Sequence, residues 1–196
     1  MKKYILNNKK IMNNKKRCSW AKTKHYIKYH DLFWGKPNHD ENYLFKLLCL
    51  ETQSVGLGFS VILSKEQEYE KAFDFNDIKK ISQMNENDID KIMKQHNVIK
   101  YKAKIKAIIL NAKAYFNLVK VYRSLDNYLW SKTNFKILKN KPSTTENDLS
   151  KKIAKELKKF GFKFIGSVTV FSYLQAIGIY DDHEKNCYLN TNKKMK

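Results

Sequence analysis

Residues 85–125 decide the fold, and they read NENDIDKIMKQHNVIKYKAKIKAIILNAKAYFNLVKVYRSL. This stretch predicts a short helix, a break near Asn97 and then a longer helix. Apolar residues of the longer helix recur at intervals of three and four positions and so share one side: Ile105, Ile108, Ile109, Ala112 and Phe116. One long amphipathic helix with a shorter partner is therefore expected at the centre of the fold.

Three further stretches favour helix. Residues 40–59 offer Asp40 as an N-cap, followed by apolar residues at helical spacing. Residues 143–161, STTENDLSKKIAKELKKFG, have a Ser/Thr start, an amphipathic middle and Gly161 as a stop. Residues 166–178, GSVTVFSYLQAIG, begin with β-branched residues that would suit a strand, but their later apolar residues keep helical spacing, and we favour a helix.

An all-β fold is disfavoured, because the chain has only six glycines and two prolines and lacks hairpin turn signals. Residues 128–145 are predicted to form a long connection. Residues 1–17 are basic and without clear periodicity, so we expect a flexible arm, followed by a domain at residues 18–190. The expected fold class is all-α, as a single compact helical domain.

The formal charge of +20 is the strongest compositional signal. An AT-rich genome would enrich Lys and Asn without selecting for any partner. The functional interpretation is a polyanionic partner, most simply nucleic acid. No apolar run is long enough for a membrane span, and the N-terminus lacks the apolar core of a signal peptide. We therefore expect a cytoplasmic protein with no membrane partner.

Cysteine and histidine raise the question of a metal site. His183 and Cys187 lie four positions apart in DDHEKNC, residues 181–187, one turn apart if that segment is helical. The chain also has Cys18 and His30 near its start. Two thiolates and two imidazoles suit a closed tetrahedral zinc site that would join the two ends of the chain. Spacing alone leaves this open, because isolated His and Cys residues are usually just packed.

Several separated blocks occur in the order seen in one known family. They are CSW at 18–20, YHDLFWGKP at 29–37, LFKLLCLETQSVGLGFSVIL at 44–63, YKAKIKAIILNAKAY at 101–115 and LSKKIAKELKKFGFKFIGSVTVFSYLQAIGIYDDHEKNC at 149–187. On these blocks the sequence resembles the 3-methyladenine DNA glycosylase I family of the helix-hairpin-helix superfamily. The resemblance implies a structural zinc ion held by Cys18, His30, His183 and Cys187.

The resemblance also implies a pocket for an extruded base. Glu51 and Tyr29 correspond to the glutamate and tyrosine that contact the base in the family, and we assign Glu51 the catalytic role. Trp20, Trp34 and Phe59 are the expected aromatic neighbours. A carboxylate and aromatic faces favour a cationic base such as 3-methyladenine in DNA over neutral adenine. Phe59 replaces the family's usual tryptophan, which predicts a weaker cation–π contact.

The helix-hairpin-helix element is expected to grip double-stranded DNA at NVIKYKAK, residues 97–104. The family tends to have glycine where this chain has Asn97 and Ala103. Asn97 is an intelligible substitute because asparagine tolerates a left-handed backbone, whereas Ala103 is harder to explain. Leu57 is the candidate wedge that fills the vacated stack, and a core leucine at the end of a turn is an equally good interpretation. The candidate phosphate contacts are Lys100, Lys102 and Lys104, although each equally suits a solvated basic face.

The expected function is therefore a monofunctional, monomeric glycosylase that hydrolyses the N-glycosidic bond of 3-methyladenine in alkylated DNA and leaves an abasic site. Asp126 is expected to be a helix N-cap without a catalytic role. Two alternatives remain. One is a catalytically silent, zinc-stapled DNA-binding protein of the same fold, and the other is the same fold acting on a different damaged base.

Overall fold

The long amphipathic stretch forms the longest described helix, α8 (Lys102–Tyr122), in the computed structural model, which describes residues 15–139 and 144–191. The shorter helix before it is α7 (Glu86–Gln95), and the chain breaks between them as expected. Ile105, Ile108 and Ala112 are fully buried in α8. The apolar stripe read from the sequence is thus the face that packs against the rest of the protein.

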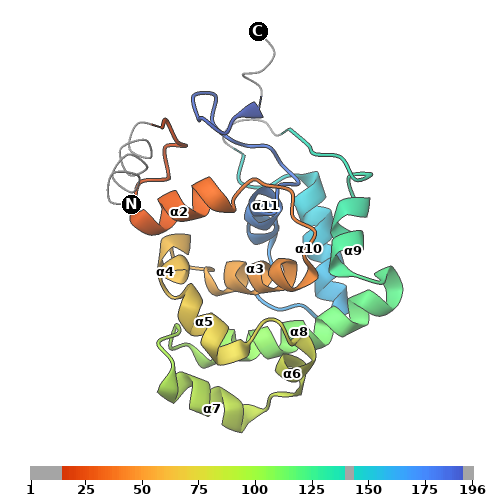
Figure 1. Ribbon diagram of the computed structural model, residues 1–196. Helices are drawn as coiled ribbons and strands as arrows, with labels where there is room; N and C mark the ends of the chain where they lie inside the picture. Colours follow the sequence, from red (N-terminus) through yellow and green to blue (C-terminus); the bar gives the residue numbers. More distant parts are fainter. Residues whose placement is uncertain (1–14, 140–143, 192–196) are drawn as a thin grey trace, which may run out of the picture.

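The described residues form ten helices and no β-strand (Figure 1). An isolated bridge joins Leu138 to Tyr180. The helices other than α7 and α8 are α2 (Lys24–Leu32), α3 (Glu41–Gln53), α4 (Phe59–Ser64), α5 (Glu66–Phe73), α6 (Ile78–Gln83), α9 (Leu125–Ser131), α10 (Asp148–Phe160) and α11 (Ser167–Ala176). The all-α prediction is confirmed.

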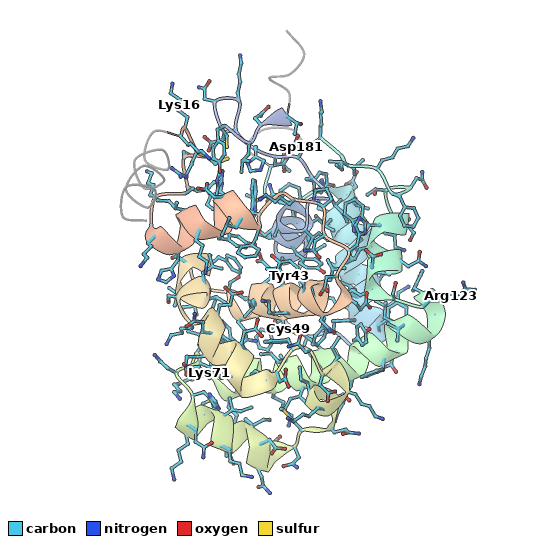
Figure 2. The ribbon with its side chains drawn as sticks, in the orientation of Figure 1. Lys16, Tyr43, Cys49, Lys71, Arg123 and Asp181 are labelled. Atoms are coloured by element: carbon cyan, nitrogen blue, oxygen red, sulfur yellow. The ribbon has the colours of Figure 1, made fainter. Side chains whose placement is uncertain are left out.

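The helix α3 lies in the middle of the molecule, with α8 along one side of it, α11 along another and α9 beside its start (Figure 1). Its residues from Leu47 to Gln53 are all buried. Cys49 is completely buried within this core (Figure 2), so it serves as a small apolar residue. The second half of α3 is therefore buried on all sides, and it carries Glu51.

Helix ends confirm some predictions and correct one. The Asp40 side chain accepts a hydrogen bond from the Tyr43 amide at 2.7 Å, as an N-cap should. Gly161 ends α10 in a left-handed conformation with φ of 103°. The predicted Ser/Thr start of α10 is wrong, because Asn147 is its N-cap and forms a capping box with Ser150.

Two other expectations are corrected. The predicted connection at residues 128–145 begins too early, because α9 extends to Ser131 and buries Tyr128 and Trp130. The N-cap of α9 is Ser124, not Asp126, whose carboxylate instead accepts a hydrogen bond from His39 Nδ1 at 2.8 Å. None of the described helices is long and apolar enough to cross a membrane.

Candidate active site and metal centre

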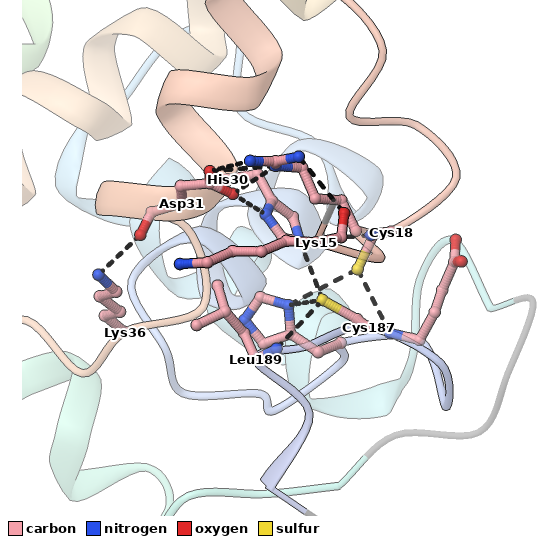
Figure 3. A network of polar contacts seen from close by, with 10 residues as sticks. Lys15, Cys18, His30, Asp31, Lys36, Cys187 and Leu189 are labelled. Atoms are coloured by element: carbon pink, nitrogen blue, oxygen red, sulfur yellow. Dashed lines mark hydrogen bonds and ion pairs between the residues drawn. The ribbon is translucent and has the colours of Figure 1, made fainter. Parts of the chain in front are cut away.

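Two cysteines and two histidines from opposite ends of the chain meet in one buried group (Figure 3). Cys18 Sγ lies 3.6 Å from His183 Nδ1. Cys187 Sγ lies 3.3 Å from His30 Nε2 and 3.6 Å from His183 Nδ1. All four ligand atoms lie within 4.8 Å of one another. The structure therefore brings together the four residues that the sequence singled out.

The distances fit a tetrahedral metal site. Zinc bonds of about 2.3 Å to sulfur and about 2.0 Å to nitrogen, directed to the corners of a tetrahedron, put the two donors about 3.5 Å apart. The sulfur–nitrogen separations here are 3.3–3.6 Å. Burial lowers the pKa of His183 to about 4, which keeps its imidazole neutral. These four residues could hold a metal ion without rearrangement of their side chains.

A second layer of contacts orients the His30 ring. Its Nδ1 lies 2.9 Å from the carboxylate of Asp31, which leaves Nε2 facing the two cysteines. Arg17 donates to both oxygens of that carboxylate, at 2.8 and 2.9 Å. Burial alone would raise the pKa of Asp31, but hydrogen bonds from Arg17 and His30 outweigh it and hold that pKa at about 2. The carboxylate thus stays ionised and fixes the histidine.

Arg17 belongs to the predicted N-terminal arm, and so does Lys16, whose carbonyl accepts a hydrogen bond from the Tyr188 amide at 2.7 Å. These contacts tie the end of the arm to the metal-ligand segment. The rest of the arm, residues 1–14, lies outside the described residues.

Two glycines let the C-terminal segment approach the N-terminal one. Gly35 has φ of +73°, and a Cβ there would lie 2.9 Å from His183 Nε2. Gly178 has φ of +78°, and a Cβ there would lie 2.3 Å from the backbone of Lys36 and Pro37. Both positions need glycine for its backbone conformation and for its lack of a side chain. The segment that carries His183 is irregular, not the helix considered from its sequence.

A cavity of about 480 Å³ lies beside the metal-ligand group. Trp34 separates the two, since its ring centroid is 4.9 Å from that of His183, and Trp20 packs edge-on against Trp34 at 5.1 Å. The cavity is lined by Trp20, Tyr26, Trp34, Glu51, Ser54, Leu57, Phe59, Ser172, Gln175, Asp182 and Glu184. Three of these residues are acidic and none is basic, although the whole chain has a net charge of +20.

Glu51 is the most deeply buried acid of this cavity, with 5% of its surface exposed. It reaches the cavity from the last turn of α3. Burial raises the pKa of Glu51 to about 8. A carboxyl group that is this poorly hydrated stays protonated at neutral pH, and a cation placed against it would strongly favour the ionised form that burial otherwise disfavours.

Tyr29 lies next to this cavity rather than in its lining. Its ring centroid is 5.4 Å from that of Phe59, and it contributes to a second cavity of about 230 Å³. The Tyr29 hydroxyl is buried and has no hydrogen-bond partner among the described residues. Burial, followed by the nearby Glu51 charge, raises its pKa well above the usual value. A buried hydroxyl without a partner is expensive, so this one is available to a ligand.

Sequence reasoning missed several lining residues. Gln175 on α11 donates to the Asp182 carboxylate at 2.7 Å. The Glu184 carboxylate accepts hydrogen bonds from the Ser19 amide and hydroxyl, at 2.8 and 2.6 Å. The only available signal was that both acids flank the metal-ligand candidate His183. Their meeting with Glu51 depends on tertiary contacts that no spacing reveals.

Comparison with known proteins identifies the family. A family model described as methyladenine glycosylase matches residues 19–190. The chain belongs to the methyladenine glycosylase family. DNA-3-methyladenine glycosylase of Haemophilus influenzae is 39% identical over 181 residues, which cover 89% of this chain and 98% of that protein. DNA-3-methyladenine glycosylase 1 of Escherichia coli is 34% identical, covering 87% and 95%.

Solved structures agree with this assignment. Structures of 3-methyladenine DNA glycosylase I from Staphylococcus aureus include one that addresses 3-methyladenine recognition. It has a TM-score of 0.85 and 39% identity, and covers 89% of this chain and 96% of that one. A tyrosine-to-phenylalanine variant of 3-methyladenine DNA glycosylase I, in complex with 3-methyladenine, has a TM-score of 0.84 and 38% identity, with 89% and 97% covered.

The structure also shows the surroundings of the predicted wedge, Leu57, and of the three predicted phosphate-binding lysines. Leu57 is 43% exposed in the turn between α3 and α4 and borders the cavity, so it is not a core leucine. Lys100 donates to the Met93 and His96 carbonyls at the end of α7. Lys102 pairs with Asp90 at 2.7 Å on the surface.

Lys104 is different, because only 6% of it is exposed. Its ammonium donates to the carbonyls of Gln53 and Val55 at 2.8 and 2.6 Å. Burial lowers its pKa. Lys104 therefore joins α8 to the turn after α3, and a phosphate would have to displace both carbonyls to reach it.

The connection between α7 and α8 does not need a left-handed residue at Asn97. Positive φ angles among the described non-glycine residues occur at Asp74, Arg123, Asn134, Phe135 and Phe164. Asn97 is instead held by its neighbours, since its side chain accepts from Lys65 at 2.6 Å and its amide donates to Glu68 at 3.2 Å. Ala103 lies in the first turn of α8, a position that alanine fills without strain.

Proposed function

We propose that this chain is a DNA glycosylase that hydrolyses the N-glycosidic bond of 3-methyladenine in alkylated DNA. The observation that best supports this function is an acidic cavity with aromatic walls in a strongly basic protein. The basic exterior suits the phosphates of double-stranded DNA, whereas the acidic cavity suits a positively charged base. Methylation at N3 gives adenine in DNA such a charge. The named relatives with this fold support the same substrate.

The chemistry needs the damaged nucleotide to leave the duplex and enter the cavity. Trp20, Trp34 and Phe59 would offer aromatic faces to the cation, each worth about 0.5–2 kcal/mol. Glu51 would become ionised against it, and the buried Tyr29 hydroxyl would gain a partner. Neutral adenine has no positive charge to interact with the aromatic faces or with the Glu51 carboxylate, so it would bind less tightly.

The reaction then breaks the bond between the sugar carbon and the base nitrogen. The base departs neutral and takes the bonding electrons, and a water oxygen bonds to the sugar carbon and loses a proton to solvent. The positive charge passes from the base to the sugar during this step, and the carboxylates of the cavity stabilise it. No lysine lines the cavity, so hydrolysis fits better than strand cleavage through a Schiff base.

We propose that the metal ion at Cys18, His30, His183 and Cys187 is structural zinc. Four protein donors would complete a tetrahedron, which leaves no open position for water or substrate. A zinc ion would supply a cross-link between the ends of the chain and no reaction step. It would hold Trp34 and the segment with Asp182 in place around the cavity.

We propose the helix-hairpin-helix assignment for α7, α8 and the turn between them. The N-terminus of α8 has no side-chain cap, so a phosphate could approach the amides of its first two residues, Lys102 and Ala103. Leu57 would fill the space of the flipped base, and Lys100 and Lys102 would add positive charge nearby. We also propose a cytoplasmic location and a monomeric state. Gel filtration of the purified protein tests the monomeric state.

Base release from methylated duplex DNA tests the proposed function. Wild-type protein should release 3-methyladenine, identified by chromatography, and Glu51→Gln should reduce the rate by at least about 100-fold, in line with loss of one preorganised charge. Glu66→Gln is the matched control, because Glu66 lies in the second cavity and pairs with Lys46. Folded, metal-loaded protein that binds DNA and releases no base would instead identify a silent DNA-binding protein. Release of another base alone would change the substrate.

A further inference from the structure

Two exposed aromatic rings meet at the start of α8. Tyr101 is 53% exposed and directly precedes α8, and Phe164 is 36% exposed in the connection between α10 and α11. Their ring centroids lie 6.5 Å apart in an edge-to-face arrangement. Such rings are usually buried, so a pair that faces outward is typical of a binding surface. We call the surface formed by Tyr101, Lys163 and Phe164 the aromatic ledge.

The ledge is built to face outward. Phe162 and Ile165 anchor the connection in the core, with 2% and 3% of their surfaces exposed. The fully buried side chain of Asn111 accepts a hydrogen bond from the Lys163 amide at 2.7 Å, which ties the backbone to α8. Phe164 adopts φ of +52°, a conformation that bulky residues rarely take. The ring is therefore held in place by its anchors rather than left loose on the surface.

A shallow hollow of about 350 Å³ adjoins the ledge. It is lined by Ala103, Lys106, Ala107, Leu110, Lys163 and Phe164. The floor is thus apolar and the rim basic. Lys106 pairs with Glu86, whereas Lys163 is exposed at the edge of the hollow. An apolar floor with aromatic and lysine edges fits the sugars, bases and phosphates of a nucleic acid strand.

The ledge and the cavity lie near the same helix, α11. The helix that starts just after Phe164, α11, carries Ser172 and Gln175 into the cavity lining. Ten helical residues span about 15 Å, and a duplex rises about 3.4 Å per base pair. The length of α11 thus equals the rise of about four to five base pairs, so one bound duplex could reach both the cavity and the ledge. Tyr101 of the ledge is also the last residue of the turn that joins α7 to α8 (Figure 1).

We propose that the aromatic ledge binds duplex DNA beside the flipped nucleotide, with Phe164 packed against a sugar or an exposed base face and Lys163 against a phosphate. This inference rests on the proposed function for the identity of the strand. Stacking on an aromatic ring is insensitive to sequence, because every base has a π face. The ledge would thus hold damaged DNA without reading its sequence.

The test is a salt titration of binding to a duplex that carries a stable abasic-site analogue. Phe164→Ala should weaken binding roughly tenfold at every salt concentration without changing the slope, because the ring carries no charge. Lys163→Gln should instead lower the slope by about one counterion. Phe164→Leu, which keeps apolar bulk but loses the π face, should fall between wild type and Phe164→Ala. Melting temperatures establish that each variant is folded.

Phe135→Ala is the matched control. Phe135 is another exposed phenylalanine with a positive φ, at 60% exposure and +57°, and it follows α9, away from the ledge. Its replacement should leave binding unchanged. If Phe164→Ala binds the duplex as tightly as Phe135→Ala does, the proposal is overturned. The ledge would then be a candidate surface for a protein partner. Base release and binding of free 3-methyladenine by the wild type report on the proposed function separately, so the two can fail independently.

Discussion

At the scale of single residues, Glu51 makes a pH-dependent contribution to stability. Burial raises its pKa from 4.5 to about 8, so the folded protein holds a proton that the unfolded chain has lost. The free energy of unfolding attributable to Glu51 therefore falls as the pH rises from about 4.5 to about 8, by an amount on the order of several kcal/mol.

Glu51→Gln should remove this pH dependence. Wild type and variant should melt at similar temperatures near pH 5, and the variant should melt at a higher temperature at pH 9. Thermal unfolding at both pH values measures this. A constant difference in melting temperature between the two proteins across this pH range would contradict the burial argument.

The wild-type rate of base release should rise with pH up to about 8, because the ionised carboxylate of Glu51 becomes easier to form.

Phe59 is a residue of the cavity wall at which the family resemblance predicts a tryptophan instead. Its ring packs 5.4 Å from Tyr29 and lines the cavity. An indole has a larger and more electron-rich face than a phenyl ring. The larger face also stacks better on the neutral, released base, so Phe59→Trp should bind 3-methyladenine about 2- to 10-fold more tightly, as measured by calorimetry. Unchanged or weaker binding, with an unaltered melting temperature, would mean that the base does not stack at this position.

At the scale of elements, α8 and the end of α3 are held together by Lys104. Lys104→Met keeps most of the side-chain volume but leaves two carbonyl groups without their donor. We expect a loss of about 1–3 kcal/mol in the free energy of unfolding. Urea titration measures this loss.

Lys102→Met is the matched control for that prediction. Lys102 is exposed and pairs with Glu86 and Asp90 on the surface, where solvent screens ion pairs, so its removal should cost much less stability than removal of Lys104. The two lysines should also differ in DNA binding. Lys102→Met should lower the salt dependence of binding, whereas Lys104→Met should leave it unchanged. Equal stabilities would show that Lys104 does not connect the two helices.

At the scale of the whole molecule, the metal-ligand group joins segments that are 152 residues apart. Removal of the metal would free both ends of the chain and leave a buried cluster of thiols and imidazoles. We expect a loss of about 3 kcal/mol or more, equivalent to a fall of about 6–12 °C in melting temperature. Calorimetry with and without a chelator measures this, and elemental analysis identifies the metal.

Cysteine variants separate the metal from ordinary packing. Cys187→Ser should lose the bound metal, whereas Cys49→Ala should retain it, because Cys49 is buried in α3 and belongs to no ligand group. Retention of one equivalent of metal by Cys187→Ser would contradict the assigned ligand set.

The sequence by itself determined the features that depend on local pattern. The stripe of Ile105, Ile108 and Ala112, the N-cap Asp40 and the stop at Gly161 each act within one or two helical turns, so their physics is visible in neighbouring residues. The four Cys and His residues that could hold a metal ion were also singled out, but their spacing alone left the site open and the family resemblance supplied the full set. The family blocks then placed Glu51 and Phe59 at one site.

Only the tertiary structure decided which side chains share an environment. Lys104 is indistinguishable from Lys102 in the sequence, yet it is buried under the turn after α3. Asp182 and Glu184 join Glu51 in the cavity because Gly35 and Gly178 let two distant segments touch. Burial is a property of the folded surroundings, and it sets the pKa of Glu51 and the role of each lysine. Local pattern therefore specified the helices, and packing between them specified the chemistry.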